Sequence, residues 1–498
     1  MPSTVRAKSG ELTSRRRLVI LAICCTAVVM ANLDTTALNV ALPAISRELH
    51  TSVAGAQWTI DAYTVVLACL LTFSGSLADR IGRKPVFQLG LAVFAVGSLA
   101  CSLAPSLGVL VGFRMVQAVG GSMMNPVAMA IIATAFTDPG QRVRAIGVWS
   151  GAIGISMAAG PVVGGFLVDA VGWEAVFWIN VPIALVALAL TALLVPDSKS
   201  RTPRAFDPVG QLLVAGVLGL LVFAIIEGPH RGWDSPVTVG CFAGAALSLA
   251  ALLWYEPRHA QPLIDVRAFR SPLFSGALAI SVLAYAAMGG FLFLNTFYLQ
   301  EIRGDRPLHA GLELLPMAAA LCVFGPLSGR MVAARGARTA LTTGALLATV
   351  AAVILGVTFD SSGTLTLLIG YALFGAGIGL INTPITATAV AGLPQAQAGV
   401  AASLATTSRQ VGQSLGVAVI GSIIASQHDA LRSAAAFHAP ATHSWMTIAG
   451  MTIAAFVVAR VCTGRWAREV LAVPVGPRGP RPEVPPPVSR PMAFAPAR

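Results

Sequence analysis

Residues 18–43, LVILAICCTAVVMANLDTTALNVALP, form an apolar stretch of membrane-spanning length that carries one carboxylate, Asp34. With Leu18 at the inner edge and a rise of about 1.5 Å per residue, Asp34 falls in the outer half of a hydrocarbon core about 30 Å thick. A charged side chain inside the bilayer costs roughly 2.5 to 3.5 kcal/mol and usually marks a functional site. We expect Asp34 to face a bundle interior or a wet cavity. The alternative is an acid close enough to the surface to reach water.

The rest of the chain has the composition of a polytopic membrane protein. Hydrophobic residues make up 56% of the sequence and charged residues 11%, with a mean hydropathy of +0.77. Apolar stretches recur along nearly the whole length and leave no room for a soluble catalytic domain, so an enzyme is not expected. The 7 cysteines lack metal-ligand spacing, and the sequence contains neither HExxH nor a P-loop. We expect no metal, disulfide, nucleotide or other cofactor.

Hydropathy predicts an all-α integral membrane fold with about fourteen transmembrane helices. They are expected to begin near residues 18, 55, 86, 107, 143, 174, 208, 237, 273, 311, 339, 364, 401 and 445. Most of the 33 lysines and arginines lie in alternate loops, starting with the N-terminus, and the other loops hold only Arg47, Arg231, Arg303, Arg306 and Arg432. This bias predicts that both termini are cytoplasmic, and it explains the net charge of +12 without nucleic acid.

Two short basic loops suggest an internal repeat, because residues 75–84 and 325–338 have similar sequences after the second and tenth spans. The repeat predicts two similar six-helix bundles with two helices inserted between them. The predicted segments are a cytoplasmic N-terminus (1–17), an N-terminal bundle (18–195), the inserted helices with their flanking loops (196–272), a C-terminal bundle (273–465) and a proline-rich cytoplasmic tail (466–498).

Residues 75–85, GSLADRIGRKP, closely resemble the loop signature of the major facilitator superfamily. Arg114, Gln117, Gly120 and Gly121 are similar to its fourth-helix pattern, and LDTTALNVALP (33–43) resembles the first helix of its fourteen-helix drug:proton antiporters. FWINVP (177–182), YLQ (298–300) and SRQVGQSLGVA (408–418) fit the same branch, so the resemblance covers roughly residues 15–465. It implies a major facilitator fold of two six-helix bundles plus two inserted helices, and multidrug efflux that confers antibiotic resistance.

The resemblance also assigns gating residues. It implies that a charge network in the 75–85 loop latches the cytoplasmic side, and that the antiporter signature in span 5 seals the interface between bundles. These residues are Gly75, Asp79, Arg80, Gly82 and Arg83 in the loop and Gly160, Pro161, Gly164 and Gly165 in span 5. Simple interfacial anchoring and ordinary tight helix packing are the alternatives. The chain departs from the family at Trp173-Glu174-Ala175, where Trp-Arg-Trp is common, and span 13 carries no acid.

Asp34 and Arg114 are the predicted proton-coupling pair, because the helical rise places them at similar depths in spans 1 and 4. An arginine keeps its charge, so its approach favours the carboxylate and its withdrawal favours protonation. The alternative is a static buried pair that only fixes helix packing.

The candidates for substrate binding are Asp61, Trp58, Tyr63, Asn39 and Gln117. Asp61 lies in the outer part of span 2, near the estimated level of Asp34, where it would attract cationic cargo beside aromatic rings. The alternative is an interfacial acid in contact with water, since Trp58 and Tyr63 also suit a headgroup belt.

Together these features predict a proton-coupled antiporter of the cell membrane that exports lipophilic small molecules, cationic ones among them, by alternating access. Its expected partners are small-molecule substrates, protons and the lipid bilayer, and we expect a monomer. The predominance of arginine over lysine hints at a bacterial source. One alternative is an exporter of the same fold dedicated to one cargo, such as a self-made antibiotic or a lipid. The other is a non-transporting receptor or scaffold.

Overall fold

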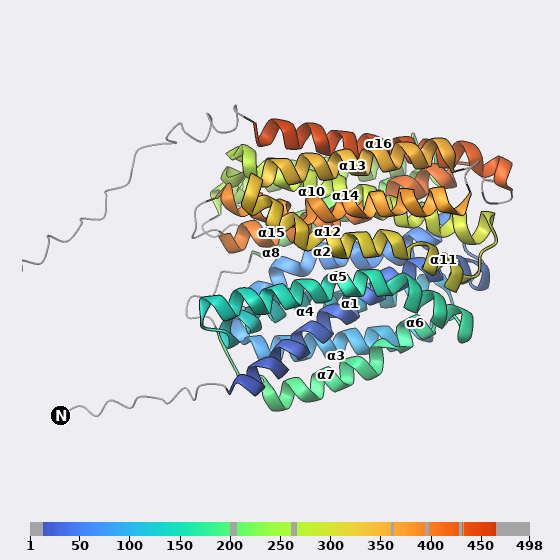
Figure 1. Ribbon diagram of the computed structural model, residues 1–498. Coiled ribbons are helices and arrows are strands. Elements are labelled where there is room, and N and C mark those ends of the chain that lie inside the picture. Colours follow the sequence, from blue (N-terminus) through green and yellow to red (C-terminus); the bar gives the residue numbers. More distant parts are fainter. Residues whose placement is uncertain are drawn as a thin grey trace, which may run out of the picture.

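The structure is a computed structural model that describes residues 13–199, 207–259, 266–359, 363–393, 398–427, 431 and 433–464. The described residues form helices and connecting turns (Figure 1). The first seven helices are α1 (Ser14–Glu48), α2 (Val53–Ile81), α3 (Arg83–Ser102), α4 (Leu107–Ala135), α5 (Pro139–Ala170), α6 (Ala175–Trp178) and α7 (Asn180–Leu194). Then come α8 (Pro208–Arg231), α9 (Pro236–Tyr255) and two short 3-10 turns (Glu256–Arg258 and Val266–Arg270).

The second half begins with α10 (Pro272–Phe297), which continues into a π-helical turn (Tyr298–Ile302). It is followed by α11 (Pro307–Glu313), α12 (Leu315–Arg335), α13 (Ala337–Thr358), α14 (Thr364–Ala391), α15 (Ala398–Ala425) and α16 (Ala434–Cys462). Among the described residues, 13 helices are long and apolar enough to cross a membrane. The more polar α15 is 28 residues long and packs between α10 and α2, so it completes the predicted set.

Helices suit this chain because lipid offers no partner for a backbone N–H or C=O, and a helix satisfies these groups within one segment. Several helices begin with a side-chain cap followed by proline, whose missing N–H costs nothing at the first helical position. Asp138, Asp207, Ser235 and Ser271 cap α5, α8, α9 and α10 in this way. The sequence therefore marks where these spans start.

Helix packing separates an N-terminal bundle of α1 to α7 from a C-terminal bundle of α10 to α16. The bundles meet along two seams: α2 packs on α15, and α5 packs on α11 and α12. The inserted helix α8 lies against both α2 and α15, and α9 packs on α8. The insertion thus covers one seam, while the predicted domain limits remain a prediction.

The ends of the bundle differ. We call the end where α1 begins and α16 ends the termini side, and the opposite end the far side (Figure 1). α16 begins at Ala434, well before the predicted start near 445. Its first turns contain His438, Pro440 and His443, which lower the hydropathy without preventing a helix. The predicted sixth span is interrupted at Ile179, between α6 and α7, and the tenth at Leu314, between α11 and α12. The proline-rich tail lies outside the described residues.

Candidate functional site: a buried ion pair in the N-terminal bundle

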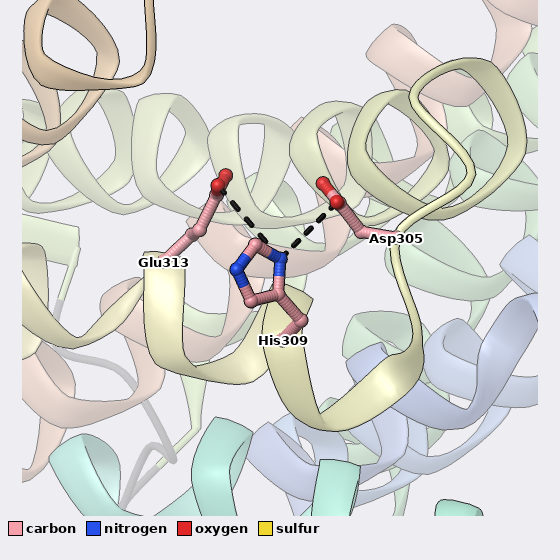
Figure 2. Close-up of side chains that lie close together, drawn as sticks. All are labelled: Asp305, His309 and Glu313. Atoms are coloured by element: carbon pink, nitrogen blue, oxygen red, sulfur yellow. Dashed lines mark hydrogen bonds and ion pairs between the residues drawn. The ribbon is translucent and has the colours of Figure 1, made fainter.

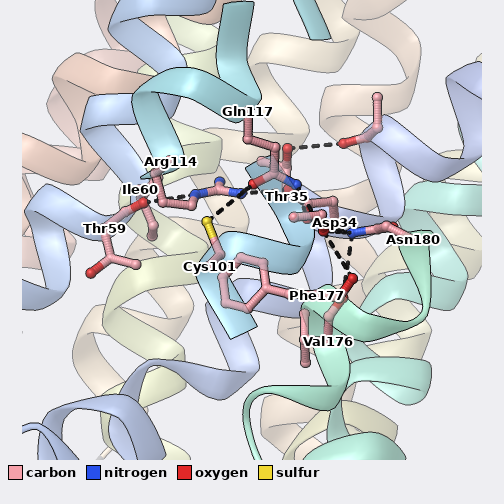
Figure 3. Close-up of polar contacts among 12 residues, drawn as sticks. Asp34, Thr35, Thr59, Ile60, Cys101, Arg114, Gln117, Val176, Phe177 and Asn180 are labelled. Carbon is pink, nitrogen blue, oxygen red and sulfur yellow. Dashed lines mark hydrogen bonds and ion pairs between the residues drawn. The ribbon is translucent and has the colours of Figure 1, made fainter. Parts of the chain in front are cut away.

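Asp34 of α1 and Arg114 of α4 form an ion pair inside the N-terminal bundle (Figure 3). Arg114 Nη1 lies 2.6 Å from Asp34 Oδ2, and both side chains are 0% exposed. Their predicted proximity is therefore present in the structure, whereas their predicted role in proton coupling is a separate question. Full burial does not fit the alternative in which Asp34 reaches water at the surface.

Neutral amides occupy the other oxygen of the Asp34 carboxylate. Gln117 Nε2 and Asn180 Nδ2 each donate to Asp34 Oδ1 at 2.8 Å. Ser98 Oγ accepts from both amides, at 3.3 and 3.1 Å, and donates to the Phe177 carbonyl at 2.8 Å. Side chains of α4 and α7 therefore converge on the carboxylate of α1, and Ser98 of α3 hydrogen-bonds both amides. A buried charge is tolerated only when it is paired and hydrogen-bonded in this way.

The guanidinium of Arg114 has further partners. Its Nε donates to the Thr59 carbonyl at 3.2 Å and its Nη1 to Gln117 Oε1 at 2.7 Å. The Tyr63 ring lies beneath it, 4.2 Å from the guanidinium carbon, in cation–π geometry. Its Nη2 is buried without a partner. The pair thus leaves one donor unused, which suits a group that changes partners during a cycle.

Of the predicted substrate-binding residues, Gln117 and Tyr63 belong to this ion-pair network. Asp61 is fully buried; its Oδ1 accepts from Thr64 at 3.3 Å and its Oδ2 has no hydrogen-bond partner. This burial does not fit an interfacial acid in contact with water. Trp58 Nε1 donates to Glu227 of α8 at 3.1 Å, and Asn39 donates to the Thr35 carbonyl of its own helix at 2.9 Å. Substrate binding by these residues remains a prediction.

Asn180 and Ser98 were missed by the sequence reasoning. Asn180 lies within FWINVP, which we matched as a motif without assigning a role to its amide. A buried amide in an apolar helix was the available signal, because such a group requires a polar partner.

Residues 75–85, predicted as a loop, are mostly helical: they comprise the end of α2, Gly82 and the first turn of α3, on the termini side. Arg83 Nη2 lies 3.8 Å from Asp79 Oδ1, and its Nη1 donates to the Ala130 carbonyl of α4 at 3.3 Å. Gly82 has φ of 117°, a region that disfavours any residue with a Cβ. Arg80 is exposed, and Gly75 has no heavy atom within 4 Å of the position that a Cβ would take. These contacts tie the loop to its own bundle, and gating by the loop remains a prediction.

The span 5 signature packs in two directions. A Cβ on Gly160 would collide with the Thr36 side chain, and a Cβ on Gly164 would lie 2.7 Å from the Cα of Ala37. Both glycines therefore let α5 approach α1 beside Asp34.

The other face of the signature meets the C-terminal bundle. A Cβ on Gly165 would collide with the Pro307 carbonyl, and a Cβ on Gly311 with the carbonyl of Pro161. Asp169 also accepts from the Leu308 N–H at 3.2 Å and lies 3.7 Å from Arg306. The signature thus touches both bundles, and α11 lies directly on α5 at the far side.

Further ion pairs stabilise α11 at the far side (Figure 2). His309 Nδ1 lies 3.1 Å from Asp305 and 4.0 Å from Glu313, with the three ligand-type atoms within 4.8 Å of one another. Arg303 pairs with the same two carboxylates, at 3.6 Å from Asp305 and 3.0 Å from Glu313. Because Arg303 already pairs with both acids, the cluster resembles an ion-pair network more than a cation site.

Comparisons with known proteins agree with this architecture. Residues 24–417 match the family model described as Major Facilitator Superfamily. The chain belongs to the major facilitator superfamily, a family of membrane transporters, and is a multi-pass membrane protein. Its fold resembles that of a bacterial homologue of the human lysosomal transporter Spinster, with a TM-score of 0.67 and 16% identity over 92% of this chain and 98% of the other.

Two relatives show how similar this chain is to other members. It is 35% identical to the multidrug resistance protein Stp of Mycobacterium tuberculosis, over 83% of this chain and 77% of the relative. It is 38% identical to the tetracenomycin C resistance and export protein of Streptomyces glaucescens, over 80% of this chain and 74% of the relative.

Proposed function

We propose that this protein is a proton-coupled antiporter of the cell membrane that exports lipophilic small molecules by alternating access. The observation that carries the proposal is the fully buried contact between Asp34 and Arg114 at 2.6 Å. Movement of Arg114 away from Asp34 would leave the ionised carboxylate without its counter-ion and favour proton uptake. A proton gradient then supplies the driving force, and no nucleotide or other cofactor is required.

The positions of the contacts between bundles support alternating access. Gln300 Nε2 of the π turn donates to the Val40 carbonyl of α1 at 2.9 Å, and Arg47 lies 3.9 Å from Glu301. With the packing of α11 on α5, these contacts close the far side. With both termini in the cytoplasm, as the basic loops predict, these contacts would close the outward-facing side, as alternating access requires in one of its states.

Export of drugs is supported by the relatives, whose names describe multidrug resistance and the export of tetracenomycin C. The second of these names also favours a narrower alternative, in which this protein exports a single antibiotic made by its own cell. A substrate panel separates the alternatives, since a dedicated exporter moves one chemical class and a multidrug exporter moves several.

The experiment uses purified protein in proteoliposomes with an imposed pH gradient. We expect gradient-driven movement of at least one lipophilic compound, abolished by a protonophore and absent from empty liposomes. If correctly folded protein moved no compound of a broad panel under a gradient, a receptor or scaffold would be the better description.

Removal of the charge at Arg83 tests the gating role of the 75–85 loop. We expect Arg83→Ala to slow transport severalfold while substrate binding and thermal stability change little, because a partly exposed ion pair contributes only about 0 to 1 kcal/mol to stability. Asp79→Asn is expected to act alike. Transport rate and substrate affinity are measured beside Arg460→Ala, a control at an exposed arginine of α16. Unchanged rates in both loop variants would leave these residues as interfacial anchors.

A further inference from the structure

Arg409, near the middle of α15, has no acidic partner among the described residues. Its Nη2 donates to the Asn382 carbonyl at 3.2 Å and to Thr386 Oγ1 at 2.6 Å, both on α14. Its guanidinium carbon lies 5.8 Å from the centroid of the Tyr285 ring on α10. None of the ion pairs in the described part of the chain includes Arg409. Its positive charge is thus left without a carboxylate.

Several donors of this cluster remain unused. Arg409 Nε is buried without a partner, and its Nη1 makes no hydrogen bond within the described residues and is not enclosed by protein. Asn382 Oδ1 accepts from the Tyr285 hydroxyl at 3.0 Å, which leaves the amide Nδ2 as a further donor. An unpaired guanidinium beside a free amide is suited to binding an acceptor that carries negative charge.

Arg409 also differs from Arg114 in its surroundings. Arg114 is fully buried and paired with Asp34, whereas Arg409 is only partly buried. An arginine in a membrane helix faces a bundle interior or water, because exposure to hydrocarbon is costly. α15 packs both on α10 of its own bundle and on α2 across the seam. We therefore expect the exposed part of Arg409 to face water beside the seam between the bundles.

We propose that Arg409, Asn382 and Tyr285 form an anion-binding subsite on the cargo pathway, and that the preferred cargo is a lipophilic molecule bearing an ionised carboxylate or phenolate. This proposal rests on the transport function proposed above. The planar guanidinium binds a carboxylate through charge-assisted hydrogen bonds, and the Tyr285 ring offers an apolar surface beside it. A cationic cargo meets a like charge at this place and is disfavoured.

A purely structural role for Arg409 makes a different prediction. Its bonds to Asn382 and Thr386 would then serve only to hold α15 against α14, and their loss would weaken binding of every cargo alike. The anionic subsite instead predicts an effect that depends on the charge of the cargo. Two dyes with the same xanthene body allow the comparison: fluorescein, which is anionic at neutral pH, and a cationic rhodamine.

The test measures the binding of both dyes to purified full-length protein by fluorescence anisotropy. We expect the wild type to bind fluorescein more tightly, and Arg409→Gln to weaken fluorescein binding roughly tenfold or more, because the variant loses the charge-assisted hydrogen bonds of the guanidinium. Rhodamine binding is expected to stay within about twofold or to improve, since Arg409→Gln removes a like charge that disfavours the cationic dye. Arg409→Lys keeps the charge but loses the planar fork, and we expect an intermediate affinity. Arg460→Gln is the matched control.

Equal losses for both dyes, or a wild-type preference for rhodamine that Arg409→Gln leaves unchanged, would overturn the proposal. Thermal melting of each variant identifies a folding defect. If Arg409→Gln does not fold, the ratio of fluorescein to rhodamine affinity in Arg409→Lys tests the proposal: a ratio equal to that of the wild type would overturn it. Transport measurements in proteoliposomes distinguish a wrong anionic subsite from a wrong assignment as a proton-coupled antiporter. Gradient-driven transport without charge preference would refute the anionic subsite alone, whereas dye binding without any gradient-driven transport would refute the antiporter.

Discussion

Asp34→Asn is expected to abolish proton-driven export, leaving no protonophore-sensitive component in proteoliposomes. The substitution removes the titratable group that Arg114 contacts at 2.6 Å. It also turns one carboxylate oxygen into an NH2 group, which must then face either Arg114 or the amides of Gln117 and Asn180. The coupling group and its hydrogen-bond pattern are thus lost together.

A folding defect has to be separated from this loss, because Asp34→Asn leaves Arg114 buried without a counter-ion, at a cost of about 3 to 5 kcal/mol. The double variant Asp34→Asn with Arg114→Gln removes both charges, and we expect it to recover much of the stability without recovering coupling. Asp234→Asn, at an exposed turn before α9, is the matched single control. Gradient-driven export by the stable double variant would show that protons are coupled elsewhere.

The sequence was sufficient to place Asp34 and Arg114 at matching depths and so to suggest a pair, because the helical rise sets their depth and the loop charges set the direction of each span. It was not sufficient for Asn180 and Ser98. The contact of Asn180 with Asp34, and of Ser98 with the Asn180 amide, depends on how α7 and α3 are rotated toward α1, and helical rise carries no information on rotation between neighbours.

The inserted helices show a second limit of the sequence. Trp58 was expected in a headgroup belt or a substrate pocket, yet its indole N–H donates to Glu227 of α8. The place of α8 against α2 and α15 follows from tertiary packing, since apolar helices of similar length can cover either seam. Motifs predicted the two bundles, but not which surface the insertion covers.

Gly165→Val is expected to open the far side and to block transport, although the variant should fold. The Cβ of the new valine would collide with the Pro307 carbonyl oxygen. It would also lie only 2.7 Å from the Cα of Leu308. Both obstacles are backbone atoms, so α11 itself has to move off α5. Overpacking of this kind costs about 1 to 3 kcal/mol, and about 1.4 kcal/mol already shifts a two-state equilibrium tenfold.

The adjacent glycine provides the matched comparison. A side chain on Gly164 would meet Ala37 of α1, within the same bundle, so Gly164→Val should lower the melting temperature and yield. Gly165→Val acts between the bundles, so its melting temperature and yield should stay near the wild-type values. Thiol labelling of Val168→Cys in a variant without native cysteines reports whether the far side is open, and we expect labelling to rise roughly tenfold with Gly165→Val. Wild-type labelling and transport in Gly165→Val would mean that the signature does not seal the interface. Closure at the far side would then depend on the polar contacts of Asp169 and Gln300 instead.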